Sequence, residues 1–286
     1  MRTGISDDRL ITGVVCTDDR CRAAARTLKE LGHAVAVWDD SGGRGPCLWA
    51  DYIIFGLPLA GADGRLKLPA GFEDMSADEV FDGIKRGARV FAGMVPPDIR
   101  EKCRLRGTEI YDYCSCEKFA VENAAVTAEC AVSIAMADRE RLVSDSRVLV
   151  TGFGRIGKLL SLKLRDMGAR VDVSARSAAD RAWIRALGMT PVRYDELADR
   201  GSGYDTVFNT VPAEVITAGV IEGLKEDCRI IDLASMPGGT DTAAARRRGI
   251  AFTRALALPG REKSALAGRI IAESVLCIIE ELEGGK

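Results

Sequence analysis

The sequence predicts an α/β fold of two Rossmann-like, doubly wound parallel-sheet domains with an interdomain cleft, and three observations support this prediction. Short apolar runs alternate with helix-patterned segments along most of the 286 residues. One apolar run, 148–150, leads into the glycine pattern Gly152-Phe-Gly-Arg-Ile-Gly157 and then into a helix-patterned segment. A long Ala-rich segment, 117–137, separates two alternating regions and predicts one connecting helix.

The first region, residues 1–116, is expected to form an α/β substrate domain. Strands are predicted at 10–16, 34–38, 52–55, 88–92 and 108–111, and helices at 19–31, 77–86 and 97–104. The segments 41–46 and 61–67 contain glycines and are expected to be irregular, at places where strands end.

The second region, 144–263, is expected to form the nucleotide-binding domain, joined to the first by a connector at 117–143. Strands after the glycine pattern are predicted at 170–174, 206–209, 229–232 and 251–253. The amphipathic segment 264–282 predicts a final helix. We expect residues 264–286 to cross back and complete the first domain, leaving a cleft between the two domains.

Composition excludes several classes of protein. Hydrophobic residues make up 47% of the chain and charged residues 29%, which is ordinary for a globular protein. The net charge is −2 with both signs mixed along the chain, so no nucleic-acid or anionic-membrane partner is expected. The N-terminus lacks an apolar signal core, and no uninterrupted apolar stretch reaches membrane-spanning length. We therefore expect a cytoplasmic protein without membrane association.

Cysteine and histidine usage argues against metal and hydrolytic chemistry. The nine cysteines are an odd number and are scattered, which favours reduced thiols. Cys103, Cys114 and Cys116 do not have an established zinc-ligand spacing, so no metal is expected. The sole histidine, His33, falls at the N-terminal edge of the first sheet, away from the carboxyl ends where ligands gather. Ser-His-Asp hydrolysis and the His-carboxylate pair of ordinary 2-hydroxy-acid dehydrogenases are therefore excluded.

The glycine pattern predicts a dinucleotide site. Gly152 allows the tight turn, Gly154 lets the backbone approach a pyrophosphate, and Gly157 lets the helix pack on the strand with its positive end towards phosphate. The strand before the pattern, the helix after it and the strand 170–174 complete a βαβ unit. We expect the dinucleotide to contact Gly152, Phe153, Gly154, Arg155, Ile156 and Gly157.

The residues after the strand 170–174 favour NADP over NAD. An NAD site usually carries an acidic residue about 20 positions after the first glycine, whereas this chain has Ser174-Ala-Arg-Ser177 there. Arg176 can pair with a 2′-phosphate in a forked geometry, and Ser174 or Ser177 can donate to it. Asp172 lies earlier in the strand, where alternation turns it away from the ribose. The alternative for Arg176 is a solvated loop charge.

Polar groups at other strand ends are expected to converge on the same edge. Ser235 with the Gly238-Gly239 backbone suits an anion-binding nest. The alternative for the Gly/Pro-containing turns is that they only shape loops, and the alternative for the cations named next is that they are solvated surface charges. Positive charge for an acidic substrate comes from Arg65, Lys67, Arg261 and Lys263. The nicotinamide half is expected to contact Asn209, Thr210, Val211 and Pro212.

An ordered set of short motifs spans nearly the whole chain. The motifs are Gly56-Leu-Pro-Leu59, Asp63-Gly-Arg-Leu-Lys67, Tyr111-Asp-Tyr113, Glu117, Asn123-Ala-Ala-Val-Thr-Ala-Glu129, Gly152-Phe-Gly-Arg-Ile-Gly157, Phe208-Asn-Thr-Val-Pro212, Ile231-Asp-Leu-Ala-Ser-Met-Pro-Gly-Gly239, Leu258-Pro-Gly260 and Ala267-Gly268. Together they resemble the A subunit of dipicolinate synthase from spore-forming bacteria. Two departures are a missing proline after Pro259-Gly260 and Cys130 in place of a glycine.

The resemblance implies an oxidoreductase that converts dihydrodipicolinate to dipicolinate (pyridine-2,6-dicarboxylate) with hydride transfer to NADP, in the mother cell during sporulation. Glu129 is a candidate to accept the ring proton, with water as the alternative. The implied partner is a flavoprotein-like second subunit, and a homo-oligomer is left open. The substrate carboxylates are assigned to Thr127, Asn123, Arg65 and Lys67, and the nicotinamide side to Asn209, Thr210 and Ser235.

Three other functions remain open. One is another NADP-dependent dehydrogenase of small acids, for instance one that acts like shikimate dehydrogenase, although the Lys-Asp arrangement of that family has no clear counterpart here. Another is a non-catalytic nucleotide-binding subunit that regulates its partner. The third is shared ancestry with dipicolinate synthase but a changed substrate.

Overall fold

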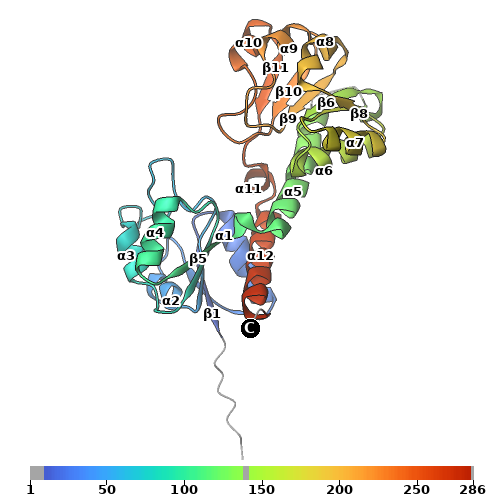
Figure 1. The fold of residues 1–286 in the computed structure, drawn as a ribbon. Helices are drawn as coiled ribbons and strands as arrows, with labels where there is room; N and C mark the ends of the chain where they lie inside the picture. The colour runs from blue at the N-terminus through green and yellow to red at the C-terminus, as the bar shows by residue number, and fades with distance from the viewer. Residues whose placement is uncertain (1–9, 138–141, 285–286) are drawn as a thin grey trace, which may run out of the picture. The chain divides into compact units, whose positions relative to one another are not determined.

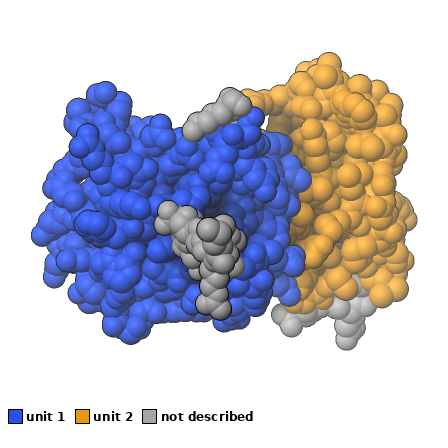
Figure 2. Space-filling model, turned by 90° about the horizontal axis from the view of Figure 1, so that it is seen from below, with its two compact units in different colours: residues 1–122, 263–286 blue, residues 123–262 orange. Residues whose placement is uncertain are grey.

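The computed structural model describes residues 10–137 and 142–284, and the chain divides into two compact units (Figures 1 and 2). Unit 1 is Met1–Glu122 with Lys263–Lys286, and unit 2 is Asn123–Glu262. Each unit holds one parallel sheet with helices interleaved along the chain, so the predicted fold class of two parallel sheets is confirmed. The N-terminal segment expected to lack a signal core, part of the predicted connector and the last two residues lie outside the described residues.

The sheet of unit 1 has the strand order β2-β1-β3-β4-β5, and every pairing is parallel. This order is typical of doubly wound sheets, in which ligands bind at the carboxyl ends of the strands where the order reverses. Its strands are β1 (Ile11–Val15), β2 (Ala34–Trp38), β3 (Tyr52–Ile54), β4 (Arg89–Ala92) and β5 (Glu109–Asp112). Its helices are α1 (Asp19–Glu30), α2 (Arg44–Leu48), α3 (Ala77–Asp82), α4 (Pro97–Leu105), the 3-10 turn η1 (Tyr113–Ser115) and α12 (Ser264–Gly284).

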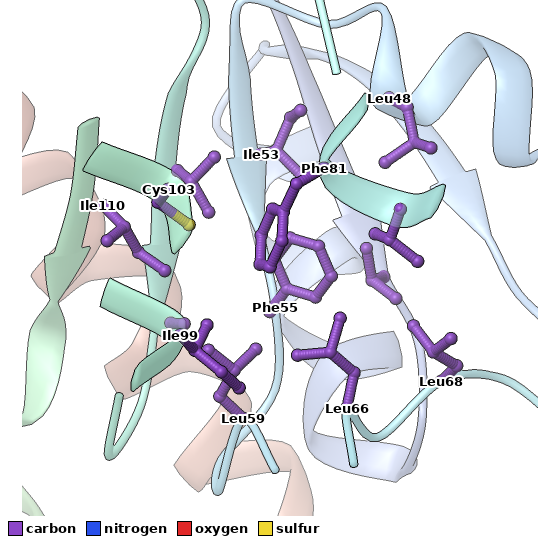
Figure 3. Close-up of a cluster of buried hydrophobic side chains, with 14 of the residues drawn as sticks. Leu48, Ile53, Phe55, Leu59, Leu66, Leu68, Phe81, Ile99, Cys103 and Ile110 are labelled. Atoms are coloured by element: carbon purple, nitrogen blue, oxygen red, sulfur yellow. The ribbon is translucent and has the colours of Figure 1, made fainter. Parts of the chain in front are cut away.

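A hydrophobic cluster joins the sheet of unit 1 to its short helices (Figure 3). Phe55 and Phe81 lie at its centre, with ring centroids 6.3 Å apart. Leu66 and Leu68 enter the cluster from the loop after β3 and are buried. Burying one leucine side chain contributes about 1.5–3 kcal/mol to the free energy of unfolding. Leu66 and Leu68, which are two positions apart, therefore anchor this loop to the core.

Helix α12 packs against α1, and a glycine allows the close approach. Helix α1 begins after Asp18, whose side chain accepts hydrogen bonds from the backbone N–H groups of Arg20 and Cys21. A Cβ at Gly268 would lie 2.3 Å from the backbone oxygen of Arg20 and 2.5 Å from Cβ of Ala23. Any side chain at this position would therefore push the two helices apart.

Substituting Gly268→Val is expected to destabilise the protein by about 3 kcal/mol, because the added side chain overlaps the backbone of α1. Urea unfolding measures the change in the free energy of unfolding. Gly284→Val, in the same helix, is the control, since a Cβ there meets no atom within 4 Å. Equal stability of the two variants would show that α12 and α1 can separate at little cost.

The sheet of unit 2 has the strand order β11-β10-β9-β6-β7-β8, again all parallel, which is the order of dinucleotide-binding sheets. Its strands are β6 (Arg147–Thr151), β7 (Arg170–Ser174), β8 (Thr190–Val192), β9 (Thr206–Asn209), β10 (Arg229–Asp232) and β11 (Ala251–Arg254). Its helices are α6 (Arg155–Asp166), α7 (Ala178–Ala186), α8 (Leu197–Arg200), α9 (Ala218–Glu222), α10 (Thr242–Arg247) and α11 (Leu258–Glu262), with 3-10 turns η2 (Val143–Asp145), η3 (Tyr194–Glu196) and η4 (Gly201–Gly203).

Two predictions about unit 1 were wrong. Residues 44–48 form α2 where an irregular segment was expected, because Gly43 takes a φ of 86° to redirect the chain and Pro46 is tolerated in a first helical turn. Helix α3 ends at Asp82 rather than at position 86. Beyond Gly83, the backbone N–H of Lys85 donates to the Leu48 oxygen at 2.8 Å instead of continuing the helix.

Helix α5 (Glu117–Met136) has residues in both units. Of the described helices, it alone is long and apolar enough to cross a membrane, with a mean hydropathy of 1.3 over an 18-residue window of which 44% is buried. Glu122 and Glu129 interrupt its apolar sequence. A buried core helix of a globular protein passes the same test.

Candidate functional site

The turn between β6 and α6 has glycines where a side chain would obstruct it. Gly152 has a φ of 88°, and a Cβ there would lie 2.6 Å from Oγ1 of Thr210. A Cβ at Gly157 would lie 2.1 Å from the Gly152 oxygen, so only glycine lets α6 approach β6 this closely. A Cβ at Gly154 would meet no atom within 4 Å, so this side of the turn is open. The geometry fits the expected roles of Gly152 in the tight turn and of Gly157 in helix packing, whereas the approach of a pyrophosphate at Gly154 stays a prediction.

The N-terminus of α6 suits an anion. Gly154 precedes the helix and provides no side-chain cap, so the first N–H groups lack the usual capping partner. These groups and the helix dipole attract phosphate. Arg155 is exposed, Phe153 is buried, and the Nζ atom of Lys158 lies 5.2 Å from the centre of the Phe153 ring. Open space, a helix N-terminus without a side-chain cap and nearby cations together fit the pyrophosphate of a dinucleotide.

A pocket of about 320 Å³ lies where β7 and β8 end, and arginine dominates its lining. Arg181 donates from one guanidinium nitrogen to the backbone oxygens of Ala175, at 3.1 Å, and Arg176, at 2.6 Å. Arg193 pairs with Asp195 at 2.7 Å. Three guanidinium groups against one carboxylate leave a net positive lining, which a phosphate group prefers. The lining residues are Ala175, Arg176, Arg181, Arg193, Tyr194 and Asp195.

Sequence reasoning pointed to Arg176 but missed Arg181, Arg193 and Tyr194. Burial raises the pKa of Tyr194, which keeps its phenol protonated as a hydrogen-bond donor at neutral pH. This group follows β8, a three-residue strand that was not predicted from the sequence. Predicting that strand would have pointed to the Arg193-Tyr194 pair directly after it, since the carboxyl ends of neighbouring parallel strands share one edge.

The remaining residues of this loop differ in their access. Ser174 is fully buried, whereas Arg176 and Ser177 are exposed. The Ser177 hydroxyl caps α7 by accepting from the N–H of Asp180 at 2.9 Å, and its own proton remains available to a ligand. Asp172 is turned into the interior, where its carboxylate accepts from Arg147 at 2.9 Å and from Tyr204 at 2.8 Å. Asp172 therefore does not take the place of the acidic residue that NAD sites usually carry.

Asn209 belongs to a buried chain of side chains that crosses three strands. Oγ1 of Thr151 donates to its Oδ1 at 2.6 Å, and its Nδ2 donates to Oδ1 of Asp232 at 2.8 Å. All three residues are fully buried. The amide of Asn209 also bonds both backbone groups of Val211, so it holds the turn after β9 in place. Its predicted contact with a nicotinamide stays a prediction, as do those of Val211 and of the exposed Pro212.

Thr210 joins this turn to the glycine turn, because its hydroxyl donates to the Thr151 oxygen at 2.7 Å. On the neighbouring loop Ser235 is exposed, but the expected anion nest was wrong. The N–H of Gly238 donates to the Ser235 oxygen at 2.9 Å, and the N–H of Gly239 donates to Asp232 at 3.1 Å. Both donors are already engaged within the protein.

Helix α5 carries three predicted site residues, of which Asn123 and Thr127 share one face and Glu129 lies on another. The Thr127 hydroxyl donates to the Asn123 oxygen at 2.8 Å, one helical turn earlier. Glu129 lies two residues further on, about 200° around the helix from Thr127. It is exposed, and its carboxylate accepts from Lys163 at 2.8 Å. Thr127 and Glu129 therefore do not face the same side of α5.

Arg65 and Lys67 lie in the loop whose leucines anchor it to the core of unit 1. Alternation along this loop exposes both cations, and Arg65 approaches Asp74 at 3.9 Å. The backbone N–H of Lys67 donates to the Leu59 oxygen at 2.9 Å, which brings Lys67 beside the turn after β3. Their roles as carboxylate ligands stay predictions.

Two residues to which sequence reasoning gave no role, Arg20 of α1 and Asp112 at the end of β5, hold the turns at the carboxyl ends of the strands of unit 1. Arg20 donates to Oδ2 of Asp18 at 2.5 Å and to the Leu57 oxygen at 2.5 Å. Asp112 accepts hydrogen bonds from the N–H groups of Met94, Val95 and Cys114. Both side chains bind backbone groups distant in sequence, which no local pattern reveals.

The described residues contain no group of three or more His, Cys, Asp or Glu side chains that could hold a metal ion. The nine cysteines all lie in the described residues, and none of them is in a disulfide. Burial raises the pKa of Cys103 to about 11 and that of Cys114 to about 12. Both thiols are therefore protonated at neutral pH and are poor metal ligands.

The two parallel sheets, the glycine turn and the arginine-lined pocket define a two-domain protein of the dehydrogenase fold. A solved L-alanine dehydrogenase shares this fold, with a TM-score of 0.65 and 12% identity over 96% of this chain and 89% of that chain. At this identity the similarity concerns the fold alone.

The more specific similarity is to the A subunit of dipicolinate synthase. That protein from Bacillus subtilis is 32% identical over 167 residues, and the match spans 58% of this chain and 56% of the length of the relative. The solved A chain from Bacillus subtilis superposes with a TM-score of 0.83 at 24% identity, covering 97% of this chain and 98% of that chain. The solved A chain from Bacillus halodurans gives 0.79 at 25% identity, covering 94% and 96%. No family model matches the chain. The resemblance expected from the motifs is therefore confirmed.

Proposed function

We propose that the protein is a dehydrogenase that oxidises dihydrodipicolinate to dipicolinate with NADP. The substrate would lose a hydride to the nicotinamide and a proton to water, giving dipicolinate, NADPH and H⁺. Bound NADP would supply the hydride acceptor. The observation that carries the proposal is the open glycine turn beside an arginine-lined pocket, in a chain similar to the A subunit of dipicolinate synthase.

The cofactor would be held by backbone groups and cations of unit 2. The turn from Gly152 to Gly157 would hold the pyrophosphate, with the first N–H groups of α6 donating to it. Arg176 would pair with the 2′-phosphate, and Arg181 and Arg193 line the same pocket. Thr210 and Ser235 would lie on the nicotinamide side. NADP rather than NAD follows from this cationic lining and from the buried pairing of Asp172.

The substrate is a dianion, so its recognition needs cations and hydrogen-bond donors. We assign this role to Arg65, Lys67, Asn123 and Thr127. These residues lie within the motifs that resemble the A subunit of dipicolinate synthase. Because forming the aromatic ring favours hydride transfer, the protein chiefly has to orient the substrate, and no histidine base is required. We assign the ring proton to water rather than to Glu129, whose carboxylate pairs with Lys163.

Substituting Glu129→Gln is therefore expected to leave the rate of dipicolinate formation within about threefold of the wild-type rate, since general-base catalysis typically contributes at least about 100-fold. Initial rates at saturating NADP measure this. Thr127→Val is the comparison, because it removes a hydroxyl proposed to bind the substrate, and it should raise KM. A loss of more than tenfold in Glu129→Gln would restore Glu129 as the base.

We also propose a setting for the reaction. The name of the relative implies a second subunit, so a flavoprotein-like B subunit of dipicolinate synthase is the proposed partner in a hetero-oligomer. By the same likeness, the protein would act in the cytoplasm of the mother cell during sporulation.

Direct assay tests the proposed function. Dihydrodipicolinate is generated in situ from pyruvate and aspartate semialdehyde, and the purified chain is added with NADP, with and without the B subunit. Dipicolinate is then measured by chromatography with ultraviolet detection. Product in either mixture supports the proposal and shows whether the partner is required. No product in both mixtures, with NADP still bound, would favour a changed substrate or a regulatory nucleotide-binding role.

A further inference from the structure

Met94 follows the carboxyl end of β4 and has a backbone conformation that non-glycine residues rarely adopt. Its φ is 55°, and only one other described non-glycine residue, Ala257, has a positive φ. A side chain in this region crowds the following carbonyl oxygen, so the surrounding structure must hold the residue there. Strain of this kind persists where other contacts enforce it, and it gathers at ligand sites.

Asp112 enforces the conformation of Met94. It is the last residue of β5 and lies opposite Ala92 of β4. Its carboxylate accepts from the N–H of Met94 at 3.1 Å and from the N–H of Val95 at 2.9 Å. A third bond, from the N–H of Cys114 at 2.9 Å, fixes the carboxylate itself. Hydrogen bonds to an ionised acceptor are among the stronger ones in proteins, and here they define the turn after β4.

The turn after β4 is joined to the turn after β3. The N–H of Leu59 donates to the Gly93 oxygen at 2.8 Å, and the N–H of Gly93 donates to the Gly56 oxygen at 3.3 Å. A Cβ at Gly93 would lie 2.6 Å from Cδ1 of Leu57, so the two turns are in close contact. We call Gly56–Leu59 together with Gly93–Val95 the β3–β4 rim. Arg20 fixes the other end of this rim through the Leu57 oxygen.

The enforced conformation presents an apolar side chain to the outside of unit 1. Met94 is 61% exposed, although Gly93 before it and Ala92 in the strand are buried. Because the Met94 side chain is mostly exposed, its burial adds little to the free energy of folding and does not offset the backbone strain. A thioether packs well against the face or edge of an aromatic ring. The β3–β4 rim therefore holds a rigid apolar contact at the edge of the sheet where ligands gather.

We propose that Met94 is a specificity-determining residue that packs against the ring of the substrate and the planar ring of the product, while cations elsewhere bind the two carboxylates. This inference rests on the proposed function, since that function makes the ligand a ring-shaped dicarboxylate. Asp112 is a positioning residue that acts through the backbone of Met94. The contact selects a ring over an acyclic diacid of the same charge.

The test measures binding of pyridine-2,6-dicarboxylate to the full chain saturated with NADP, by calorimetry. Oxidised cofactor with product forms a complex in which no hydride can move. The variants Met94→Gly and Met94→Ala should each weaken binding about tenfold, and Met94→Leu should stay within about threefold because it keeps an apolar contact. The affinity for NADP should be unchanged in all three. Leu105→Ala is the matched control, since Leu105 is 69% exposed in α4 of the same unit.

Stability provides a second readout. Met94→Gly should unfold at the same temperature as the wild-type chain or higher, because glycine adopts a φ of 55° without crowding. Reduced affinity without reduced stability separates a ligand contact from a structural role. A midpoint lowered by more than about 5 °C would overturn the argument from strain.

The outcomes distinguish this inference from the proposed function. Wild-type binding of pyridine-2,6-dicarboxylate that persists unchanged in Met94→Gly and Met94→Ala would overturn the role of Met94 and leave the proposed function standing. Absence of binding to the wild-type chain, together with absence of turnover, would overturn both. Equal weakening in Leu105→Ala would also overturn the inference, because the effect would then not be local.

Discussion

The Gly154→Val variant is expected to fold as stably as the wild-type chain and to bind NADP at least about 100 times more weakly. Gly154 has a φ of −77°, which any residue adopts, and a Cβ there meets no protein atom within 4 Å. The added side chain would instead occupy the space expected for the pyrophosphate. Losing two hydrogen bonds to a charged group costs about 3 kcal/mol or more, which is a factor of about 100 in affinity.

Fluorescence titration with NADPH and thermal unfolding measure the two halves of this prediction. Gly219→Val is the control, because Gly219 lies in α9 of the same unit and its nearest neighbour is 4.0 Å from a Cβ. It should change neither affinity nor stability by a large amount. If Gly154→Val binds NADPH as tightly as the wild-type chain, the dinucleotide does not lie on this turn.

The Arg176→Asp variant is expected to lose NADP affinity by about 100-fold and to keep or gain affinity for NAD. The exposed guanidinium of Arg176 would pair with the 2′-phosphate, and a charge-assisted pair of this kind is worth about 1.5–3 kcal/mol. An aspartate would add repulsion against the phosphate and could accept a hydrogen bond from the ribose of NAD. The ratio of the two dissociation constants is the quantity to measure, because it cancels general effects on the site.

The control for this charge reversal is Arg170→Asp. Arg170 begins the strand β7 that Arg176 follows, so the same change in net charge is made at the opposite edge of the sheet. Both side chains are exposed. An unchanged ratio in Arg176→Asp would show that the 2′-phosphate is recognised elsewhere, and the same shift in Arg170→Asp would show that net charge alone is responsible.

The parts of the molecule that local physics determines were predictable from the sequence. A Cβ at Gly152 or at Gly157 would lie 2.6 or 2.1 Å from another protein atom. Only glycine fits at these two positions, so the requirement is visible in the sequence itself. Five of the six strands of unit 2 were found because buried parallel strands are short apolar runs. The sixth, β8, was missed because it has three residues, of which one is an exposed threonine and one a proline. The family resemblance followed from motifs of this kind.

Long-range polar contacts were not predictable in the same way. Asn209 ends a strand, which is where ligand contacts gather, yet its amide is bonded to Asp232 in the neighbouring strand, 23 residues away. Met94 shows no unusual local pattern, because its conformation depends on Asp112 in another strand. A single sequence shows that a residue is polar or exposed at a strand end, but not which distant group it meets.

The buried chain from Thr151 through Asn209 to Asp232 has a consequence for how the protein can diverge. It ties the ends of β6, β9 and β10 and the backbone of the two loops after β9 and β10 into one network of buried side chains. Changing one member alone leaves a buried polar partner unsatisfied, which costs about 1–3 kcal/mol. When related proteins adapt this fold to another ligand, we therefore expect substitutions among the exposed side chains of the loops. Thr151, Asn209 and Asp232 are expected to be kept together or to change together.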